Sequence, residues 1–318
     1  MLKKSKALLL FLLLFFLVSC SNNIDKSKVK RVGLLVPQTV SDQVWGTLGY
    51  KGMLKIQSQF DADIFYKEGM TSQLAIEQSV DEFDKKGVTL IFGHGREFSD
   101  SFNKLAPKYP HIHFISFNGD AVEKNTTSLK IESYASGFFG GMTAAHVSKS
   151  DKLGIVAAHK WQPEIKGYVE GAHFEKPNAK VYIEYTDDWD DKEKALDLLD
   201  QLIKEKVDVV YPAGDAFNVP VIEKLKEEGL TAIGYVSDQS DLGQTTVLTS
   251  TVQHVDKLYE IAAEKYAKGE LPSGNLHFDF QDGAISMGTY SPLVKKSFQK
   301  KIQNYVEIYI ETGKLPKS

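Results

Sequence analysis

Short apolar runs alternate with amphipathic stretches along most of this chain. The runs are rich in Val, Ile, Leu and Phe, whereas apolar residues in the stretches recur with the spacing of one helix face. The runs predict strands over residues 31–36, 62–66, 88–92, 112–117, 128–131, 153–158, 180–185, 207–211, 231–236 and 247–251. The stretches predict helices over residues 45–59, 72–86, 97–108, 134–148, 163–174, 191–204, 219–228, 255–268 and 295–311. Such alternation is typical of parallel sheets covered by helices on both faces.

The pattern starts again near the middle of the chain. The segments "FDKKGVTLIFGHG" (83–95) and "IKEKVDVVYPAG" (203–214) both contain a helix end, a short apolar strand and a loop with glycine. We therefore predict an α/β protein of two open parallel-sheet lobes, each below about 150 residues. The first lobe is expected to comprise residues 31–148 and 273–318, and the second lobe residues 149–272, with a ligand cleft between them.

The first nineteen residues have the pattern of an export signal, so we exclude them from the fold. Three lysines precede an uninterrupted apolar run over residues 7–18, which is too short to span a membrane. The sequence Leu-Val-Ser-Cys that follows resembles a lipobox and ends at Cys20, the only cysteine of the chain. We expect residues 1–19 to be a lipoprotein signal peptide, Cys20 to carry the lipid, and residues 20–30 to form a tether. The alternative is an ordinary secretory signal with a chance cysteine.

The charge of the chain argues against nucleic acid as a direct partner. The formal net charge is −4, and because the signal segment carries three of the lysines, the rest of the chain has a formal charge of −7. Arg31 and Arg96 are the only arginines. Proteins that bind nucleic acid gain much of their affinity from basic side chains beside phosphates. An acidic exported chain with two arginines is therefore not expected to bind nucleic acid.

The loops after the predicted strands contain all three tryptophans of the chain. Trp45, Trp161 and Trp189 each fall in such a loop, and open α/β sheets bind ligands outside the carboxyl ends of their strands. Carboxylates and amides accompany them in the same set of loops. Flat aromatic faces with polar acceptors suit a neutral polyhydroxylated ligand that contains a flat ring. Alternatively, the tryptophans are buried anchors, and Asp190 and Asp191 cap the following helix.

The sequence contains no motif that predicts catalysis. It has no G-x-S-x-G or H-E-x-x-H sequence, and its single cysteine is assigned to the lipid. The loops do not supply a nucleophile, a base and an orienting group together. The "GHG" segment (93–95) is a tight loop after a strand and not a dinucleotide fingerprint. We therefore expect a protein that is not an enzyme and that uses neither a cofactor nor a metal.

The loop Asp42-x-x-Trp45 is one of several segments that carry a family resemblance. The others are "GYKG" (49–52), "YPHIHFI" (109–115), "GFFGGMTAAH" (137–146), "DVVYPAGD" (208–215), "AIGYVSDQ" (232–239) and "VLTSTVQHVDK" (247–257). Together they resemble the basic membrane lipoprotein (BMP, or PnrA-like) family of nucleoside-binding proteins, which have the type I periplasmic-binding-protein fold and feed ABC importers. The resemblance covers nearly all of the mature chain. It looks closest to a branch described as positive regulators of competence genes in bacilli.

The resemblance implies a ligand site with residues from both lobes. Asp42 would contact the nucleoside, and Trp45 and Trp189 would form the two walls of an aromatic clamp around the purine. Gly214 would belong to a glycine-rich loop at the site, and Asp238 would hold ribose hydroxyls. No cofactor is implied.

Two positions of the implied site depart from the family pattern. Asn118 stands where the family has an Asp that hydrogen-bonds to the base, which removes a charge and adds an NH₂ donor. Gln253 stands where the family has a Lys that binds the ribose. Loss of one charge-assisted hydrogen bond would reduce the binding free energy by about 1.5–3 kcal/mol. A purine nucleoside is still the first ligand to expect.

Three functions follow from these observations. The first is a lipid-anchored extracytoplasmic binding protein that captures a purine nucleoside or a related small ligand for an ABC permease. The second is a regulatory or sensor lipoprotein that promotes competence gene expression through a membrane partner, with an altered or vestigial cleft. The third is an exported enzyme, such as a nucleoside hydrolase that uses the acidic segment 187–191.

Overall fold

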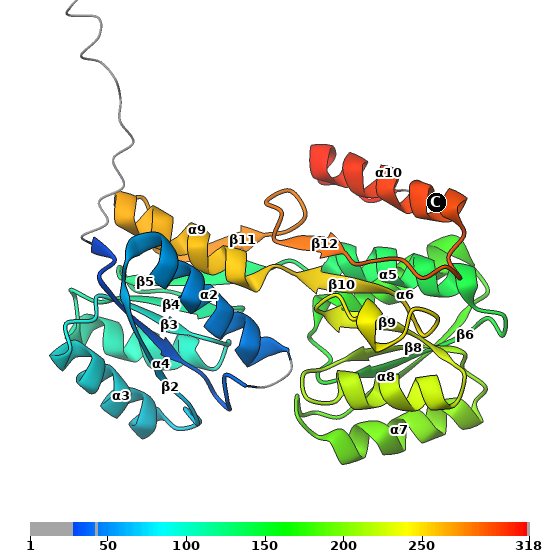
Figure 1. Cartoon of the computed structure of the whole chain (residues 1–318), viewed down its shortest axis with the longest axis horizontal. Coiled ribbons are helices and arrows are strands. Elements are labelled where there is room, and N and C mark those ends of the chain that lie inside the picture. The colour runs from blue at the N-terminus through cyan, green and yellow to red at the C-terminus, as the bar shows by residue number, and fades with distance from the viewer. Residues whose placement is uncertain (1–27, 42–43, 317–318) are drawn as a thin grey trace, which may run out of the picture.

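The computed structural model describes residues 28–41 and 44–316, which form two α/β lobes side by side (Figure 1). Each lobe has one six-stranded sheet, and the predicted fold class is confirmed. The expected signal peptide, Cys20 and Asp42 lie outside the described residues. Within the described part of the chain, none of the helices combines the length and hydropathy of a membrane span.

The sheet of the first lobe is entirely parallel. Its central strands are buried on both faces, as helices on both sides of a sheet require. In spatial order, its strands are β2 (Asp63–Lys67), β1 (Arg31–Leu35), β3 (Leu90–Gly93), β4 (His113–Phe117), β5 (Thr126–Ile131) and β11 (Gly274–Phe278). The helices of this lobe are α2 (Trp45–Phe60), α3 (Gln73–Lys85), α4 (Phe98–Leu105) with the short η2 (Ala106–Lys108), and α9 (Val255–Lys268).

The sheet of the second lobe has the same arrangement with one antiparallel edge strand. In spatial order, its strands are β7 (Lys180–Tyr185), β6 (Lys152–Ala157), β8 (Val209–Ala213), β9 (Thr231–Val236), β10 (Val247–Gln253) and the antiparallel β12 (Ile285–Met287). Its helices are α5 (Tyr134–Val147), α6 (Pro163–Glu175), α7 (Lys192–Lys204), α8 (Asn218–Glu227), η3 (Ser240–Leu242) and α10 (Lys296–Thr312).

Each sheet has a switch point where successive helices change face. In the first lobe, α2 packs into one core cluster, whereas α3 and α4 pack into another on the opposite face of the sheet. In the second lobe, α6 is separated from α7 and α8 in the same way. The loops after β1 and β3, and those after β6 and β8, therefore diverge at the carboxyl edges of their sheets. Ligands of open α/β sheets bind at such switch points.

The helix α5 packs on α6 of the second lobe through glycines. A Cβ atom at Gly137 would lie 2.1 Å from the backbone oxygen of Glu164, and one at Gly171 would lie 1.9 Å from that of Phe138. No side chain larger than hydrogen fits at either position, so the two helices lie in direct backbone contact. This packing assigns α5 to the second lobe, although it precedes the crossing expected near residues 148–152.

Two more segments lie in a different lobe from the one that the sequence predicted. The helix α9 packs on α2 of the first lobe, where Lys55 pairs with Asp256 and Glu260, each at 2.9 Å. The expected return of residues 273–318 to the first lobe is wrong beyond β11. The strand β12 pairs with β10 because the chain crosses again after residue 278. The helix α10 then packs on the second lobe, where Phe298 stacks on His146 with 3.7 Å between ring centroids.

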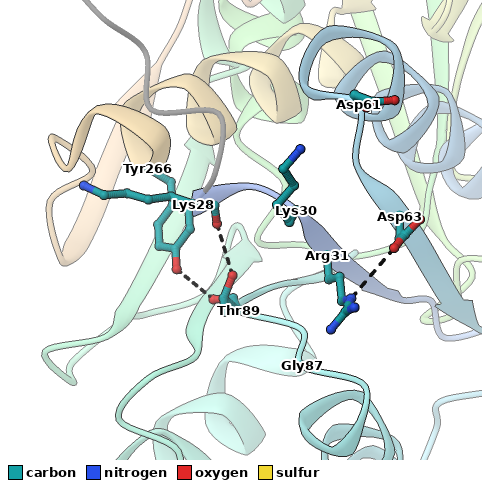
Figure 2. Close-up of a pocket in the computed structure, with 8 residues that line it drawn as sticks. All are labelled: Lys28, Lys30, Arg31, Asp61, Asp63, Gly87, Thr89 and Tyr266. Carbon is teal, nitrogen blue, oxygen red and sulfur yellow. Dashed lines mark hydrogen bonds and ion pairs between the residues drawn. The ribbon is translucent and has the colours of Figure 1, made fainter.

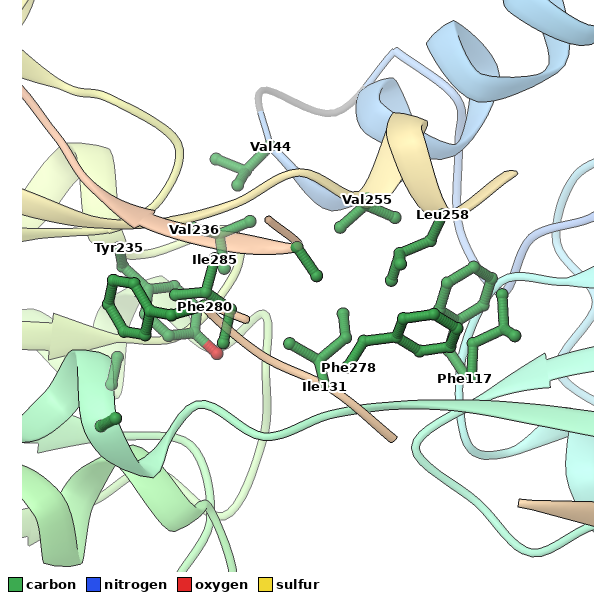
Figure 3. Packing of buried hydrophobic residues seen from close by; sticks show 14 of the residues in the cluster. Val44, Phe117, Ile131, Tyr235, Val236, Val255, Leu258, Phe278, Phe280 and Ile285 are labelled. Atoms are coloured by element: carbon green, nitrogen blue, oxygen red, sulfur yellow. The ribbon is translucent and has the colours of Figure 1, made fainter. Parts of the chain in front are cut away.

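The three crossings between the lobes run through a shared hydrophobic core (Figure 3). Ile131 ends β5, Val255 begins α9, and Phe278 ends β11, and all three are buried in one cluster with residues of both lobes. Phe280 and Ile285 continue the cluster along the third crossing. The lobes are therefore joined by packed strands rather than by loose linkers.

Candidate ligand-binding site between the lobes

The loops at the switch point of the first lobe bring Trp45 and His94 together. Trp45 follows β1 and begins α2, whereas His94 follows β3. Their rings stack with 4.4 Å between centroids and 20° between planes, and Phe117 meets the indole edge-on at 6.0 Å. His94 is fully buried, while Trp45 is half-buried. We call Trp45, His94 and Phe117 the first-lobe wall.

Glycines in α2 make room behind the first-lobe wall. A Cβ atom at Gly49 would lie 2.9 Å from the His94 ring, and one at Gly52 would lie 2.5 Å from the Tyr259 ring of α9. The sequence "GYKG" thus lets a histidine and a tyrosine lie directly against the helix. Burial lowers the pKa of His94 to about 4, although its hydrogen bond to the Trp45 carbonyl acts in the opposite direction. The imidazole is neutral at pH 7.

The second-lobe wall consists of His159, Trp161 and Trp189, from the loops after β6 and β7. His159 stacks on Trp161 with 5.4 Å between centroids, and both rings meet Trp189 edge-on at 5.1 Å and 5.7 Å. Trp161 is 47% exposed, and Trp189 is half-buried. None of the three tryptophans is fully buried, although Trp45 and Trp189 pack against the hydrophobic core.

A chain of hydrogen bonds links Gly214 to the loop of Asp238. The Gly214 carbonyl accepts from Asn218 Nδ2 at 2.6 Å, and Asn218 Oδ1 accepts from Gln239 Nε2 at 2.6 Å. The loop after β8 is also tied to the second-lobe wall, because the Trp189 carbonyl accepts from the backbone N–H of Asp215 at 3.1 Å. The structure therefore brings Trp189, Gly214 and Asp238 into one connected set of loops.

Asp238 is exposed and already receives hydrogen bonds from the protein. Its Oδ2 accepts from Thr289 N at 3.0 Å and from Thr289 Oγ1 at 2.7 Å, and its Oδ1 accepts from Ser240 N at 3.2 Å. Partial burial acts to raise the pKa of Asp238, but these hydrogen bonds outweigh it and the pKa is lowered. The carboxylate is ionised at pH 7 and held in one orientation.

Asn118 and Gln253 lie at the ends of strands on different sheets. Asn118 follows β4 with a positive φ of 56°, and its Oδ1 accepts from Ile131 N at 2.9 Å. Because a backbone N–H only donates, this bond fixes the amide oxygen toward Ile131 and turns the NH₂ group away. Gln253 ends β10 and is 9% exposed, opposite Ile285 of β12. The two positions therefore lie on different lobes.

Side chains of the two lobes meet in front of the walls. The Arg96 guanidinium lies over the Trp161 ring, with 4.4 Å from Cζ to the centroid. Glu97 is solvent-accessible, but the surrounding protein displaces much of its hydration. Its pKa is raised by that desolvation and also by the charge of Asp190 from the other lobe.

Trp45 and Trp189 have different ring partners. Trp45 contacts His94 and Phe117 of the first lobe, whereas Trp189 contacts His159 and Trp161 of the second lobe.

Sequence reasoning missed several residues of this region. His94 was interpreted only as part of a tight loop, and His159, Asn218 and Gln239 were not assigned to the walls or to their support. Arg96 was noted only as one of the two arginines of the chain. The signal that could have identified His94 was its position, because His94 and Trp45 follow adjacent strands at a switch point. Asp191 does cap α7, since its side chain accepts from Lys194 N at 3.0 Å.

A separate pocket of about 570 Å³ lies at the other end of the first sheet (Figure 2). Lys30, Arg31, Asp63 and Thr89 line it, and these residues lie at or just before the starts of β1, β2 and β3. Arg31 Nε pairs with Asp63 at 3.7 Å across it. Because ligands of this sheet type bind at strand ends and not at strand starts, this pocket is distinct from the candidate site.

Comparison with known proteins agrees with the fold. The family model for PnrA-like substrate-binding proteins of ABC transporters (Bmp) matches residues 29–318. The transcriptional activator protein Med of Bacillus subtilis is 47% identical over 314 residues, which cover 99% of each chain. A crystal structure of a transcriptional activator of the comK gene from Bacillus halodurans has a TM-score of 0.84 and 45% identity, covering 90% of this chain and 100% of that one.

A more distant relative is a nucleoside-binding protein. The ABC transporter nucleoside-binding protein BmpA of Lactococcus lactis is 26% identical over 231 residues, which cover 64% of this chain and 65% of the relative. The matches to the family model and to Med extend over nearly the whole described chain. This chain belongs to the PnrA-like family of ABC transporter substrate-binding proteins.

Proposed function

We propose that the chain is a lipid-anchored extracytoplasmic solute-binding protein that binds a purine nucleoside, or a related small ligand, and passes it to an ABC permease. One observation carries the proposal: each lobe of a PnrA-like chain places a tryptophan wall at the carboxyl edge of its sheet. Aromatic faces stack on nucleobases with little dependence on base identity. Closure of the lobes would bring Trp45 and Trp189 to opposite faces of the base.

The polar groups around the walls suit the remainder of a nucleoside. The Asn118 NH₂ group is turned away from Ile131 and would donate to an acceptor on the base edge. The Asp238 carboxylate is ionised and oriented, as an acceptor for ribose hydroxyls must be. Asp42 and Gln253 are proposed to complete the site, on the strength of the family resemblance.

The charges favour a nucleoside over a nucleotide. The negative charge of Asp190 in the second lobe acts on Glu97 of the first lobe, and the Asp238 carboxylate of the second lobe is ionised. The Arg96 guanidinium is already engaged over Trp161. A phosphate would add two negative charges next to these carboxylates. Their electrostatic repulsion would weaken binding, and it is stronger in low-dielectric surroundings than in water. We therefore expect the 5′-monophosphates to bind much more weakly than the nucleosides.

Titration calorimetry of the chain from residue 21 tests the proposal, because this form keeps every described residue. Adenosine, guanosine and inosine are titrated in turn, with adenosine 5′-monophosphate as the charged control. The expected result is saturable heat at one site for at least one nucleoside and little heat for the monophosphate. Absence of both heat and a thermal shift for all three nucleosides would refute nucleoside binding.

The membrane attachment has its own test. Cys20 would carry a diacylglycerol, which gives two acyl chains and a stable anchor. Replacement of Cys20 by Ala should move the protein from the membrane fraction to the soluble fraction, and metabolic labelling with palmitate should be lost. A C20A protein that stays in the membrane fraction would contradict anchoring at this residue.

A second function, regulation of competence genes, is favoured by two similar proteins. Both are described as transcriptional activators, at 47% and 45% identity. The replacements Asn118 and Gln253 fit a sensor whose ligand site has changed. A competence-gene reporter in cells with Trp45→Ala separates the two functions. If the protein senses a ligand, reporter expression falls with nucleoside affinity. An unchanged reporter signal, together with lost binding, would leave uptake as the role of the site.

A further inference from the structure

The geometry points to His94 as a positioning residue for the ligand ring. His94 would act through Trp45 and not by direct contact with the ligand. This inference rests on the proposed function, because it concerns the same ligand site. His94 does not need to touch the ligand in order to act. It would do so by holding the indole of Trp45 in one place and by covering one of its faces.

Two reciprocal hydrogen bonds join His94 to Trp45. His94 Nε2 lies 2.7 Å from the Trp45 carbonyl oxygen, and Trp45 Nε1 donates to the His94 carbonyl oxygen at 3.2 Å. A carbonyl oxygen only accepts, so Nε2 carries the ring proton of the imidazole. Each residue therefore binds the backbone of the other with its own side chain. Rotation of the indole out of the wall would break one of these bonds and unstack the pair.

The second ring nitrogen of His94 is bound from another direction. With the proton on Nε2, Nδ1 of the neutral imidazole is an acceptor, and the Tyr259 hydroxyl donates to it at 2.9 Å. Tyr259 is fully buried and stacks on Phe92 with 4.3 Å between centroids. Because both nitrogens have partners, only one tautomer and one orientation of the His94 ring satisfy the site.

The stack determines which face of Trp45 is available. His94 lies against one face of the indole at 4.4 Å, and Gly49 of α2 lies behind the imidazole with no room for a Cβ atom. His94 therefore has no space to move away from the indole. A ligand ring can stack only on the opposite face of Trp45. Because His94 fixes the position of the indole, it also sets the depth and tilt of the bound ring.

The hydrogen bonds from Trp45 through His94 to Tyr259 also connect the first-lobe wall to a crossing between the lobes. Tyr259 belongs to α9, and α9 begins at Val255, directly after β10 crosses from the second sheet. The sequence of contacts runs from Trp45 through His94 to Tyr259 and so to the start of the crossing. The first-lobe wall is thereby fixed to the element about which the lobes would move.

The test uses the chain from residue 21 with ¹⁵N-labelled tryptophan, which gives one indole N–H signal for each of three tryptophans. His94→Phe keeps an aromatic ring but loses both hydrogen bonds, whereas His94→Gln keeps one donor for the Trp45 carbonyl. The matched control is His113→Gln. His113 is another desolvated histidine, but its Nε2 binds Thr127 Oγ1 at 2.7 Å, away from the wall.

We expect the Trp45 indole signal to shift or broaden in both His94 variants before any ligand is added. The signals of Trp161 and Trp189 should stay in place. Adenosine affinity, measured by calorimetry, should fall at least tenfold in His94→Phe and less in His94→Gln. Tyr259→Phe, which removes only the hydroxyl donor, should give a smaller loss of twofold to fivefold. The control His113→Gln should leave the Trp45 signal and the affinity within twofold of the wild type.

Two results would overturn the inference. One is an unchanged Trp45 signal in both His94 variants. The other is an equal loss of affinity in His113→Gln, which would assign the effect to general stability. Failure of the proposed function is distinguishable, because then the wild type itself binds no nucleoside. The free-state Trp45 signal still decides the role of His94 in that case.

Discussion

The two aromatic walls differ in how firmly the protein holds them. In the first-lobe wall, His94 is fully buried, and both of its nitrogens and the Trp45 indole nitrogen have hydrogen-bond partners. In the second-lobe wall, Trp189 packs against the hydrophobic core, but Trp161 is nearly half exposed and is placed by ring contacts and by Arg96 of the other lobe. A rigid wall lowers the entropic cost of ligand binding. We therefore expect the first lobe to offer a preformed surface and Trp161 of the second lobe to adapt when a ligand binds.

The largest effect that distinguishes the walls should come from Trp45→Ala. Loss of one base-stacking aromatic costs about 1–3 kcal/mol, and the alanine also leaves His94 without its stacked partner. We expect nucleoside affinity to fall about 10- to 100-fold by calorimetry. Trp161→Ala is the control, because this ring is exposed and pairs with Arg96. Equal losses in the two variants would remove the distinction between a fixed and an adaptable wall.

Acid should weaken the first lobe through His94. The unfolded histidine takes up a proton below its ordinary pKa of 6.5, but the buried one does so only below about 4. Between these values the unfolded state binds more protons, so the free energy of unfolding falls as pH falls, by about 1.4 kcal/mol per pH unit and about 3 kcal/mol in total. Urea denaturation at pH 7, 6 and 5 measures this slope.

His94→Gln serves as the control for the acid effect, because glutamine does not titrate. The variant should be less stable at pH 7 but should lose less stability on acidification than the wild type. Identical slopes for the two proteins would show that His94 is not the group responsible. The desolvated His113 has a pKa lowered to about 4 as well, and it contributes equally to both slopes.

Gly52→Ala should destabilise the support of the first-lobe wall. The added Cβ would lie 2.5 Å from the Tyr259 ring, and overpacking of this kind costs about 1–3 kcal/mol. That cost exceeds the gain of up to about 1 kcal/mol from replacing glycine in a helix. Ser58→Ala, on the exposed side of the same helix, should change the unfolding free energy by less than about 0.5 kcal/mol. A G52A protein as stable as S58A would refute the close approach.

The smallest effect is expected at the contact between the lobes. Arg96→Ala removes the guanidinium from Trp161, and an exposed cation–π pair contributes about 0.5–1 kcal/mol. Because this contact joins the lobes, its loss should weaken nucleoside binding about two- to fivefold. Arg96→Lys keeps a cation and should lose less. Tighter binding in Arg96→Ala would mean that the contact opposes closure.

Much of the fold was predictable because local pattern and tertiary context agree. The predicted strands and helices match the observed elements within a few residues, and both sheets are parallel as the alternation indicated, except at the antiparallel edge strand β12. The strands β11 and β12 themselves were not predicted. The lobe assignment of α5, α9 and α10 was not predictable in the same way. Their apolar faces show that they pack on something, but only the glycine contacts, ion pairs and ring stacks show on which sheet they pack.

The position of the tryptophans after strands was predictable from the sequence, but the residues that support them were not. Trp45, Trp161 and Trp189 stand out because they are rare, large and placed after strands. His94 has no such signal, since a histidine between two glycines is equally suited to a turn. Its importance comes from the adjacency of β1 and β3, which is a property of sheet order. The placement of Asp42, Asn118, Gln253 and Asp238 around a ligand stays a prediction.

The most direct test of the account is where a bound nucleoside lies relative to the two walls. Nuclear Overhauser effects between the base protons of bound adenosine and the labelled indoles report this position. The account predicts contacts with both Trp45 and Trp189, one from each lobe, in a saturable complex. A saturable complex with contacts to neither indole, or the absence of any saturable complex, would contradict it.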